Sequence, residues 1–389
     1  MGASGVEPLT SAMSTRRSPT ELSAHRIAPG HIAPSPGPVN LSAHRVGPLP
    51  PERAGRRPGR PAGAPATLRR AGAYGVMPGV GARGVSPPLT NDRLGQPIEV
   101  LRPKELAIPL VLSSPHSGDI YPPSLLQAAR LGLAELRGLE DGFVDELFAD
   151  APDLGAPLLH ARFARAYVDP NREAYELDAE IFEGPLPEYV NATSVKARAG
   201  LGTVPSRIGG RSIYRARLSF LEARRRIDCA YRPYHEALRG LLEESGARFG
   251  TVLLLDCHSM PNQPPPANGA RGEPIDVALG DRYGRTCAPG IVECAERFLR
   301  AEGLRVARNR PYAGGFITAH YGRPEGGVHA LQIEVRRGLY MDERAFRPSE
   351  DMAAFAGVLR GFLAALGGFV ADRMVPRRRR PSPTRLPGA

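Results

Sequence analysis

The stretch Thr251–Pro261, TVLLLDCHSMP, joins an apolar run to a group of polar residues. Thr251–Leu255 consists of apolar or β-branched residues, and such a run predicts a buried strand. Asp256, Cys257 and His258 follow directly, so we expect the strand to end there. Ligands of open α/β sheets bind at the carboxyl ends of the strands, which makes His258 a candidate functional residue.

Outward from this strand, apolar runs alternate with helical patterns along residues 97–372. We expect further strands over Pro109–Ser113, Leu158–Ala161, Ala166–Val168, Arg305–Ala307 and Ala330–Val335. We expect helices from about Gly142 with Asp141 as its N-cap, over Tyr214–Ser245 with an interruption near Pro233, over Gly290–Ala301, and over about Ser349–Ala371. Residues 183–212 and 309–324 are expected to be loops. The alternation predicts an α/β fold, a three-layer sandwich with a mixed central sheet between helices.

The positive charge of the chain lies in its two ends. The 389 residues carry a net charge of +11, of which residues 1–96 contribute +8 and residues 373–389 contribute +6. Residues 97–372 therefore carry −3, and we expect them to be one catalytic domain that binds no nucleic acid. Residues 1–96 are rich in Pro, Gly, Ala and Arg without a sustained period, which predicts a disordered extension. Residues 373–389 are expected to be a disordered, Arg-rich tail.

Three further expectations concern the start of the chain, the membrane and the cellular compartment. Residues 1 to about 76 are either an over-extended start, with Met77 as the candidate true start, or a translated extension. No apolar run of membrane-spanning length stands out, so we expect no membrane association. The four cysteines have no C-x-x-C spacing, which is typical of reduced thiols and favours a cytoplasmic location.

Four polar clusters fall at the predicted strand ends. Ser113–Gly118 contains His116, Asp169–Arg172 reads DPNR, Asp256–Ser259 contains His258, and Glu334 lies in an apolar strand. Taken singly, each has a structural interpretation: a hydrogen-bonded loop histidine, ordinary turn chemistry, or a glutamate paired with Arg336. Cys257 is not paired with His258 as a nucleophile, because neighbours on an extended chain point to opposite sides.

Together the clusters supply the parts of a metal-dependent hydrolase. Two imidazoles and a carboxylate form a three-ligand zinc site with an open position for water. A separate glutamate then acts as general base and general acid for that water. An Asn-Arg pair is suited to capture of a substrate carboxylate.

The chain resembles the N-formylglutamate amidohydrolase family over roughly residues 108–345. The matching stretches are SSPHSGDIYP, EDGFVDELF, RAYVDPNRE, YRPYHEAL, LLLDCHSMP and RPYAGGFITAHYGRPEGGVHALQIEVRRGLYMDE, in the order of the family. The family is in turn similar to zinc carboxypeptidases and aspartoacylases, so the resemblance implies a zinc-peptidase-like fold and one zinc ion per chain.

The resemblance also implies a role for each site residue. His116 and His258 would be zinc ligands, Asn171 and Arg172 would bind the substrate carboxylate, Glu334 would activate water, and Arg165 would stabilise the oxyanion. The acidic zinc ligand is assigned to Asp141, with Glu140 and then Asp119 as alternatives. Two positions depart from many family members: DPNR stands in place of DLNR, and Gly142-Phe143 in place of Trp-His.

The function implied by the resemblance is hydrolysis of N-formyl-L-glutamate to formate and L-glutamate, a step of histidine degradation. One alternative is a related deacylase for another N-acyl amino acid or small amide. An alternative from another class is a polyanion-binding protein whose hydrolase core is degenerate. The native metal, the substrate and the oligomeric state are left open by the sequence.

Overall fold

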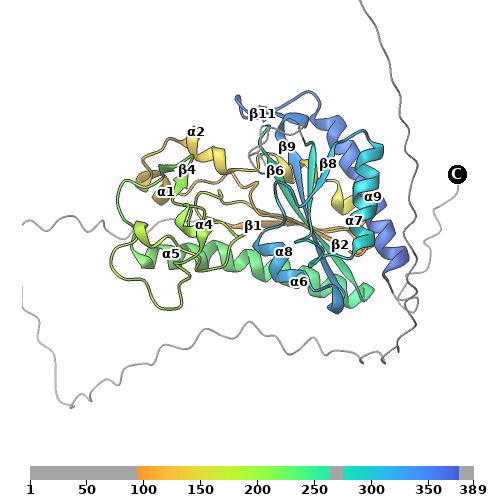
Figure 1. Ribbon diagram of the computed structural model, residues 1–389, viewed down its shortest axis with the longest axis horizontal. Helices are drawn as coiled ribbons and strands as arrows, with labels where there is room; N and C mark the ends of the chain where they lie inside the picture. The colour runs from red at the N-terminus through yellow and green to blue at the C-terminus, as the bar shows by residue number, and fades with distance from the viewer. Residues whose placement is uncertain (1–93, 263–274, 376–389) are drawn as a thin grey trace, which may run out of the picture. The chain divides into compact units, whose positions relative to one another are not determined.

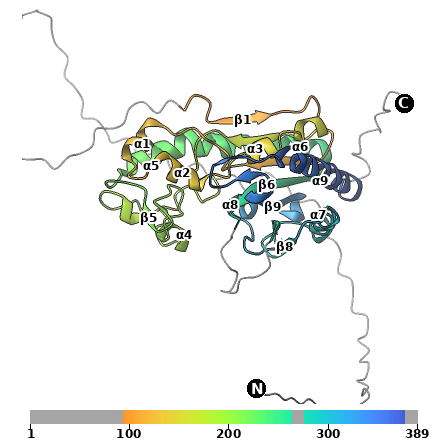
Figure 2. The same cartoon turned by 90° about the horizontal axis from the view of Figure 1, so that it is seen from above.

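The computed structural model describes residues 94–262 and 275–375 (Figure 1). Seven strands form one sheet in the order β1-β3-β2-β6-β9-β7-β8, with β1 and β8 at opposite edges (Figure 2). The strands are β1 (Ile98–Leu101), β2 (Leu110–Ser114), β3 (Leu158–Ala161), β6 (Val252–Met260), β7 (Val277–Gly280), β8 (Val306–Arg308) and β9 (Val328–Arg336). The pairs β1–β3 and β7–β9 are antiparallel and the other neighbours are parallel, so the sheet is mixed.

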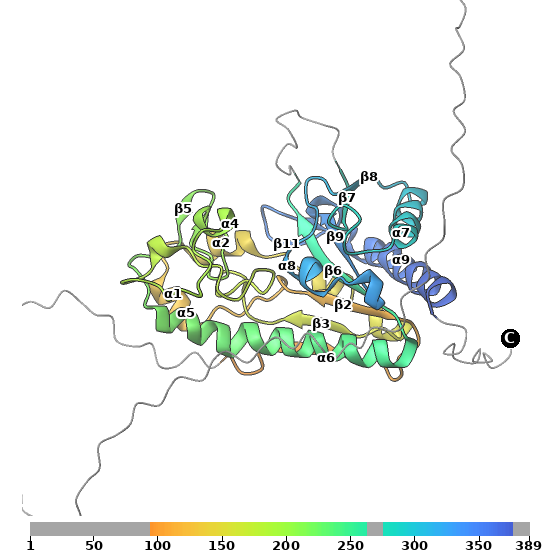
Figure 3. The same ribbon diagram turned by 60° about the horizontal axis from the view of Figure 1, so that its bottom comes forward.

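Helices cover both faces of the sheet (Figure 3). One face packs against α3 (Val144–Leu147), α7 (Pro289–Ala301) and α9 (Met352–Arg373). The other face packs against α6 (Arg232–Phe249) and α8 (Phe316–Tyr321). Alternate residues of β6 belong to the two cores, Leu253 and Leu255 to the first and Val252 and Leu254 to the second. Burial of both faces explains the continuous apolar run, and the predicted three-layer α/β fold with a mixed central sheet is confirmed.

The remaining elements are short. The α-helices are α1 (Pro123–Ala128), α2 (Leu133–Leu136), α4 (Val195–Arg198) and α5 (Phe220–Arg226), and a π-helical turn covers Ile227–Tyr231. Single 3₁₀ turns cover Arg137–Leu139, Ala151–Leu154, Ala179–Ile181, Pro324–Gly326 and Arg337–Leu339. Two hairpins pair β4 (Arg207–Ile208) with β5 (Arg211–Ser212) and β10 (Met341–Asp342) with β11 (Arg347–Pro348).

The central strand is longer than predicted. β6 continues through Asp256, Cys257 and His258 to Met260, with each of its nine residues paired to β9. The prediction that the strand ends at Asp256 is therefore wrong. The polar residues remain in the sheet because their side chains find buried hydrogen-bond partners, which offsets the cost of burying them.

Other predicted elements also need correction. No strand covers residues 166–168, where a turn over 165–167 stands instead, and α8 lies inside the predicted loop at 309–324. The helix predicted over Tyr214–Ser245 begins at Phe220 and continues past Pro233 to Phe249. Asp141 is not an N-cap: α3 begins two residues later than expected, after Phe143, without a side-chain cap. The expected loop 183–212 contains α4 and the β4–β5 hairpin.

The C-terminal helix bears on the expectation about membranes. By length and composition α9 is apolar enough to span a membrane, with a mean hydropathy of 1.7 over its most apolar 18 residues. The expectation from the sequence that no apolar run has membrane-spanning length is therefore wrong. In the structure one side of α9 contributes Phe355, Leu359, Phe362 and Leu366 to the core against α7 and the sheet. These contacts pack one side of α9 onto the domain.

All four cysteines are free thiols, as predicted. Residues 1–93 of the predicted extension over 1–96 and residues 376–389 of the predicted tail lie outside the described residues. The domain boundaries at 97 and 372 therefore stay predictions.

Candidate metal centre and active site

The polar clusters meet at the carboxyl ends of the central strands. β2 leads into the segment that carries His116, while β6 and β9 carry His258 and Glu334, which are register partners on neighbouring strands. Asp141 lies before α3, and its backbone N–H donates to the His116 carbonyl at 3.0 Å. The sheet thus brings together four side chains that are far apart in the sequence.

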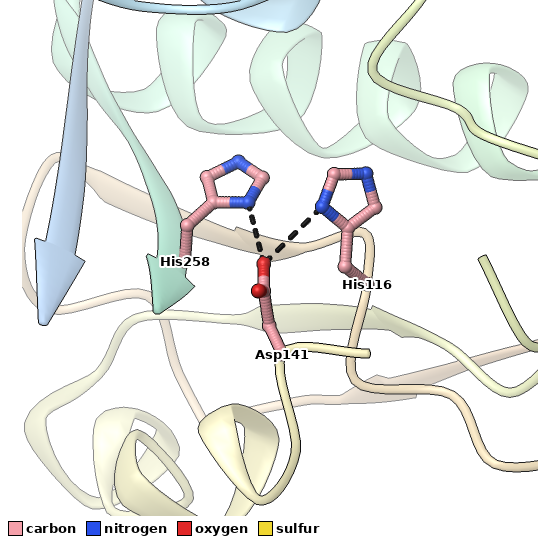
Figure 4. Close-up of side chains that lie close together, drawn as sticks. All are labelled: His116, Asp141 and His258. Carbon is pink, nitrogen blue, oxygen red and sulfur yellow. Dashed lines mark hydrogen bonds and ion pairs between the residues drawn. The ribbon is translucent and has the colours of Figure 1, made fainter. Parts of the chain in front are cut away.

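His116, Asp141 and His258 form a buried group that is able to hold a metal ion (Figure 4). Oδ2 of Asp141 lies 3.2 Å from Nδ1 of His116 and 2.9 Å from Nδ1 of His258. The three ligand atoms lie within 4.8 Å of one another. Two imidazole nitrogens and one carboxylate oxygen are the donor set of three-ligand zinc sites, so these residues fit the predicted ion.

The two alternative acidic ligands point elsewhere. Glu140 is buried, but its carboxylate accepts hydrogen bonds from Tyr121 and from Arg137. Asp119 is exposed. Of the three candidates, the structure places only Asp141 between the two imidazoles.

Each histidine is held from behind by a second carboxylate. Nε2 of His116 lies 2.8 Å from Oδ1 of Asp169, and Nε2 of His258 lies 3.0 Å from Oδ2 of Asp256. Metal-binding histidines commonly donate their second ring N–H to a carboxylate, which fixes the ring and increases its basicity. Both rings are therefore oriented with Nδ1 toward Asp141.

The buried charges of the group favour a cation. Burial alone would raise the pKa of Asp141, but the hydrogen bonds and charges of His116 and His258 hold that pKa well below its usual value. Burial likewise opposes ionisation of Asp169, and Arg165 and His116 keep its pKa well below the usual value. The pKa of His258 is raised well above its usual value, because Asp256 and Asp141 outweigh the effect of burial. The carboxylates are ionised and require positive charge between them.

The second oxygen of Asp141 is also fixed. Oδ1 accepts a hydrogen bond from Ser259 at 3.2 Å and lies 3.5 Å from Nη2 of Arg337. The same Nη2 donates to the Glu140 carbonyl at 2.6 Å. Arg337 is buried, so it braces the segment that carries Asp141 as well as its carboxylate.

Glu334 is a buried carboxyl group beside His258, its partner on the neighbouring strand. Burial raises its pKa to about 8, whereas the charges of His258 and Arg165 lower it. Gln332 donates a hydrogen bond to Oε1 at 2.8 Å. The alternative pairing with Arg336 does not occur, because Arg336 pairs with Asp276 at 2.7 Å. A carboxyl group with a pKa near neutrality is suited to both accepting and returning a proton.

Arg165 and Asn171 both contact the carboxylates or rings of this group. Nε of Arg165 donates to Oδ2 of Asp169 at 2.9 Å. Nδ2 of Asn171 lies 3.1 Å from Nε2 of His258, and its Oδ1 accepts from the backbone N–H of Ile317 at 2.8 Å. These two predicted residues are thus brought to the centre of the site.

Arg172 lies at the side of the site. Its Nε donates to the Leu201 carbonyl at 2.6 Å and its Nη1 donates to the Asn171 carbonyl at 2.8 Å. Nη2 makes no hydrogen bond within residues 94–262 and 275–375.

The departure at Gly142 has a structural counterpart. A Cβ atom at residue 142 would lie 2.8 Å from the ring of Phe346, and Phe143 packs against the same ring at 5.8 Å. Arg137 lies over that ring, 4.0 Å from its centre. Phe346 therefore occupies space beside Asp141 that a side chain at 142 would need.

Sequence reasoning missed Asp169, Asp256, Gln332 and Arg337. Asp169 and Asp256 stand in the quoted DPNR and DCHS clusters, two residues before Asn171 and His258. Alternation along an extended strand puts Asp256 on the same side as His258, so this signal was present in the sequence. No local pattern marks Arg337, because its contacts within the site are with residues 140, 141 and 259, while its one nearby partner, Glu343, lies outside the site.

The fold and the buried polar group define the chain as an α/β enzyme with a site able to hold a metal ion. The chain belongs to the N-formylglutamate amidohydrolase family, whose model matches residues 108–341, and it is therefore an amide hydrolase by family.

Relatives agree over nearly their whole length. The chain is 34% identical over 284 residues to N-formylglutamate deformylase of Pseudomonas aeruginosa, covering 71% of this chain and 98% of the relative. It is 33% identical over 279 residues to N-formylglutamate deformylase of Pseudomonas putida, covering 68% and 95%. The crystal structure of N-formylglutamate amidohydrolase from Ralstonia eutropha JMP134 is similar with a TM-score of 0.67 and 39% identity, over 71% of this chain and 99% of that chain. The predicted family is confirmed.

Proposed function

We propose that this protein hydrolyses N-formyl-L-glutamate to formate and L-glutamate, with one zinc ion held by His116, Asp141 and His258. The single observation that carries the proposal is the buried His–Asp–His group with Glu334 beside it on the neighbouring strand. The names of the relatives support the substrate, since both curated proteins are N-formylglutamate deformylases.

A zinc ion bound there would lower the pKa of a water molecule and polarise the formyl carbonyl. Glu334 takes the proton from the attacking water as the water oxygen bonds to the formyl carbon. Arg165 faces the carbonyl oxygen, where negative charge develops. Glu334 then gives the proton to the amide nitrogen as the carbon–nitrogen bond breaks, which releases formate and the free amine.

Asn171 and Arg172 would orient the substrate through its carboxylate. Asn171 contacts His258, so the carboxylate bound by this pair is the one nearest the scissile amide, the α-carboxylate. The Nη2 nitrogen of Arg172 has no other hydrogen-bond partner within the described residues and is available to that group. A role in histidine degradation and a cytoplasmic location stay predictions from the resemblance and the cysteines.

The decisive experiment measures formate release from N-formyl-L-glutamate and the metal content of the same purified sample. We expect turnover with about one zinc per chain, loss of activity with a chelator, and recovery with zinc. Metal without turnover would overturn the substrate and keep the metal site. A sample that contains no metal and releases no formate would overturn the proposal as a whole.

A second candidate is a deacylase for another N-acyl amino acid. The observation that favours it is Phe346, which fills the space beside Gly142 next to the metal group. Competition among N-formyl and N-acetyl amino acids decides between the two, and a higher kcat/KM for a substrate other than N-formyl-L-glutamate would favour this candidate.

A further inference from the structure

One helical segment contacts the turn that carries the substrate-binding residues. The stretch Tyr231–Leu238, YRPYHEAL, is part of the family pattern and has no role in the mechanism above. It begins at the last residue of the π-helical turn and continues as the first two turns of α6. From here, side chains reach the Asp169–Arg172 turn.

Two of these side chains bond to main-chain carbonyls on either side of Asn171. The hydroxyl of Tyr231 donates to the carbonyl of Arg172 at 2.8 Å. Nε2 of His235 donates to the carbonyl of Pro170 at 2.8 Å. The two bonds fix the peptide unit before Asn171 and the peptide unit after Arg172, so they hold the two-residue segment at both ends.

The π-helical turn explains how these side chains come to face the sheet. Pro233 has no N–H, and its ring would clash with the carbonyl four residues earlier in a regular helix. The wider turn over Ile227–Tyr231 accommodates the proline without ending the helix. Tyr231, Tyr234 and His235 are then three and four residues apart and lie on one face. π-helical turns of this kind are frequent at functional sites.

His235 is fixed in both orientation and protonation state. Burial lowers its pKa to about 4, so the ring is neutral at neutral pH. A neutral ring that donates from Nε2 accepts at Nδ1, and the Tyr321 hydroxyl lies 2.9 Å from Nδ1. The ring also stacks on Tyr321 at 14° and contacts Tyr231, with 4.3 Å between ring centres. The N–H toward Pro170 is therefore held in one direction.

We propose that Tyr231 and His235 are positioning residues that hold Asn171 and Arg172 in the geometry needed to bind the α-carboxylate of the substrate. The inference rests on the proposed function and adds to it the part of the fold that sets substrate orientation. The hydrogen bonds and ring contacts of Tyr231 and His235 within the described residues are with the turn, α6 and α8, and none is with His116, Asp141 or His258.

The test uses the zinc-loaded full chain with Tyr231→Phe, His235→Ala and His235→Gln. Loss of one of these hydrogen bonds should raise KM for N-formyl-L-glutamate about tenfold and change kcat by less than about threefold. Glutamine retains an N–H that can reach the Pro170 carbonyl, so His235→Gln should recover part of the loss seen with His235→Ala. Zinc content should stay at one per chain.

A second substrate distinguishes a loss of carboxylate positioning from a general loss of the fold. For N-formyl-L-glutamate α-amide, which lacks the α-carboxylate, KM should change by less than about twofold in each variant. Tyr175→Phe is the matched control, because it removes a hydroxyl that bonds to Arg232 on the same helix and not to the turn. This control should leave kcat and KM unchanged.

The outcomes are distinguishable. No formate release by the wild-type chain overturns both the proposed function and this inference. Wild-type activity with an unchanged KM in Tyr231→Phe and His235→Ala overturns the inference alone. An equal rise in KM for both substrates also overturns it, since the residues would then support the fold and not carboxylate binding.

Discussion

At the residue scale, the site is a set of carboxylates arranged around two histidines. Asp141 lies between the Nδ1 atoms, while Asp169 and Asp256 hold the Nε2 atoms. Three buried carboxylates at this spacing repel one another unless positive charge lies among them. The His258 ring, whose pKa is raised by Asp256 and Asp141, supplies part of that charge without a metal, and a divalent ion supplies it when bound. The outer carboxylates therefore matter for metal affinity as much as for ring orientation.

Asp256→Asn should weaken zinc binding by about 10- to 100-fold, because asparagine keeps the size of the side chain but removes its charge. A chelator competition titration measures the affinity. Asp276→Asn is the matched control, since Asp276 is a buried carboxylate that pairs with Arg305 and Arg336 away from the metal group. Equal zinc affinities in Asp256→Asn and the wild type would contradict the role of Asp256.

Glu334→Gln should retain zinc and lower kcat by about 10²- to 10⁴-fold, because glutamine cannot accept the proton of the attacking water. His258→Ala should lose the metal itself. Parallel measurement of formate release and metal content separates the two effects. A fully active Glu334→Gln protein would show that another group moves the proton.

At the element scale, the sequence predicts five of the seven strands of the sheet and misses β1 and β7. β3 is predicted to the residue, while β2, α7 and β9 are predicted within two residues of their ends, because apolar runs and turns mark them. The extension of β6 through His258 is missed because polar residues argue against a buried strand. Their partners lie on β2, on β9 and in the segment before α3, so only the assembled sheet reveals them.

The metal group shows the same limit of local sequence patterns, which do not reveal contacts between distant residues. Histidine and carboxylate ligands are found from cluster positions and family resemblance. The choice of Asp141 over Glu140 depends on which carboxylate the chain turns inward, and that depends on Arg337 and Ser259. These contacts join residues more than 100 positions apart, which no local pattern encodes.

Gly315→Ala tests the packing of α8 against the substrate turn. A Cβ atom at residue 315 would lie 2.3 Å from Oδ1 of Asn171, which must then move. We expect KM to rise about tenfold or more and the free energy of unfolding to fall by about 1–3 kcal/mol. Gly368→Ala in α9 is the control, because no atom lies within 4 Å of its Cβ position and alanine favours the helix. Steady-state kinetics and urea unfolding measure both effects, and a Gly315→Ala protein equal to the control would contradict this packing.

His235 should make the helix that supports the substrate turn sensitive to acid. Its pKa is lowered from 6.5 to about 4 by burial, so the unfolded chain binds a proton that the folded chain does not between these pH values. The stability contributed by the neutral ring is complete above about pH 6.5 and is lost as the pH falls toward 4. Between pH 7 and pH 5 the wild type should lose about 1–2 kcal/mol more free energy of unfolding than His235→Gln. Urea unfolding of both proteins at the two pH values, at equal metal loading, measures the difference, and equal losses would show that His235 is not held neutral.

At the scale of the whole molecule, charge separates the ends of the chain from its catalytic part. Residues 97–372 carry a net charge of −3, while the ends carry +8 and +6. The family match covers residues 108–341, and the two curated relatives are covered over 98% and 95% of their length by about 70% of this chain. The relatives thus have no counterpart for most of the residues of this chain that lie outside the matched part. We therefore expect catalysis to depend on the acidic core, and any binding to polyanions to depend on the basic ends.

Removal of residues 1–93 and 376–389 should therefore leave catalysis intact. We expect the shortened protein to keep one zinc per chain and kcat/KM within about twofold of the full chain, since every site residue lies between 116 and 337. We also expect it to lose any retention on immobilised nucleic acid at low salt, because binding to phosphates depends on positive charge. Formate release, metal content and salt-dependent retention of both proteins provide the measurement. A full-length chain that is retained on nucleic acid and releases no formate would favour the polyanion-binding alternative. Equal turnover by both proteins would assign the catalytic activity to residues 94–375. Any retention on nucleic acid would then belong to the two basic ends.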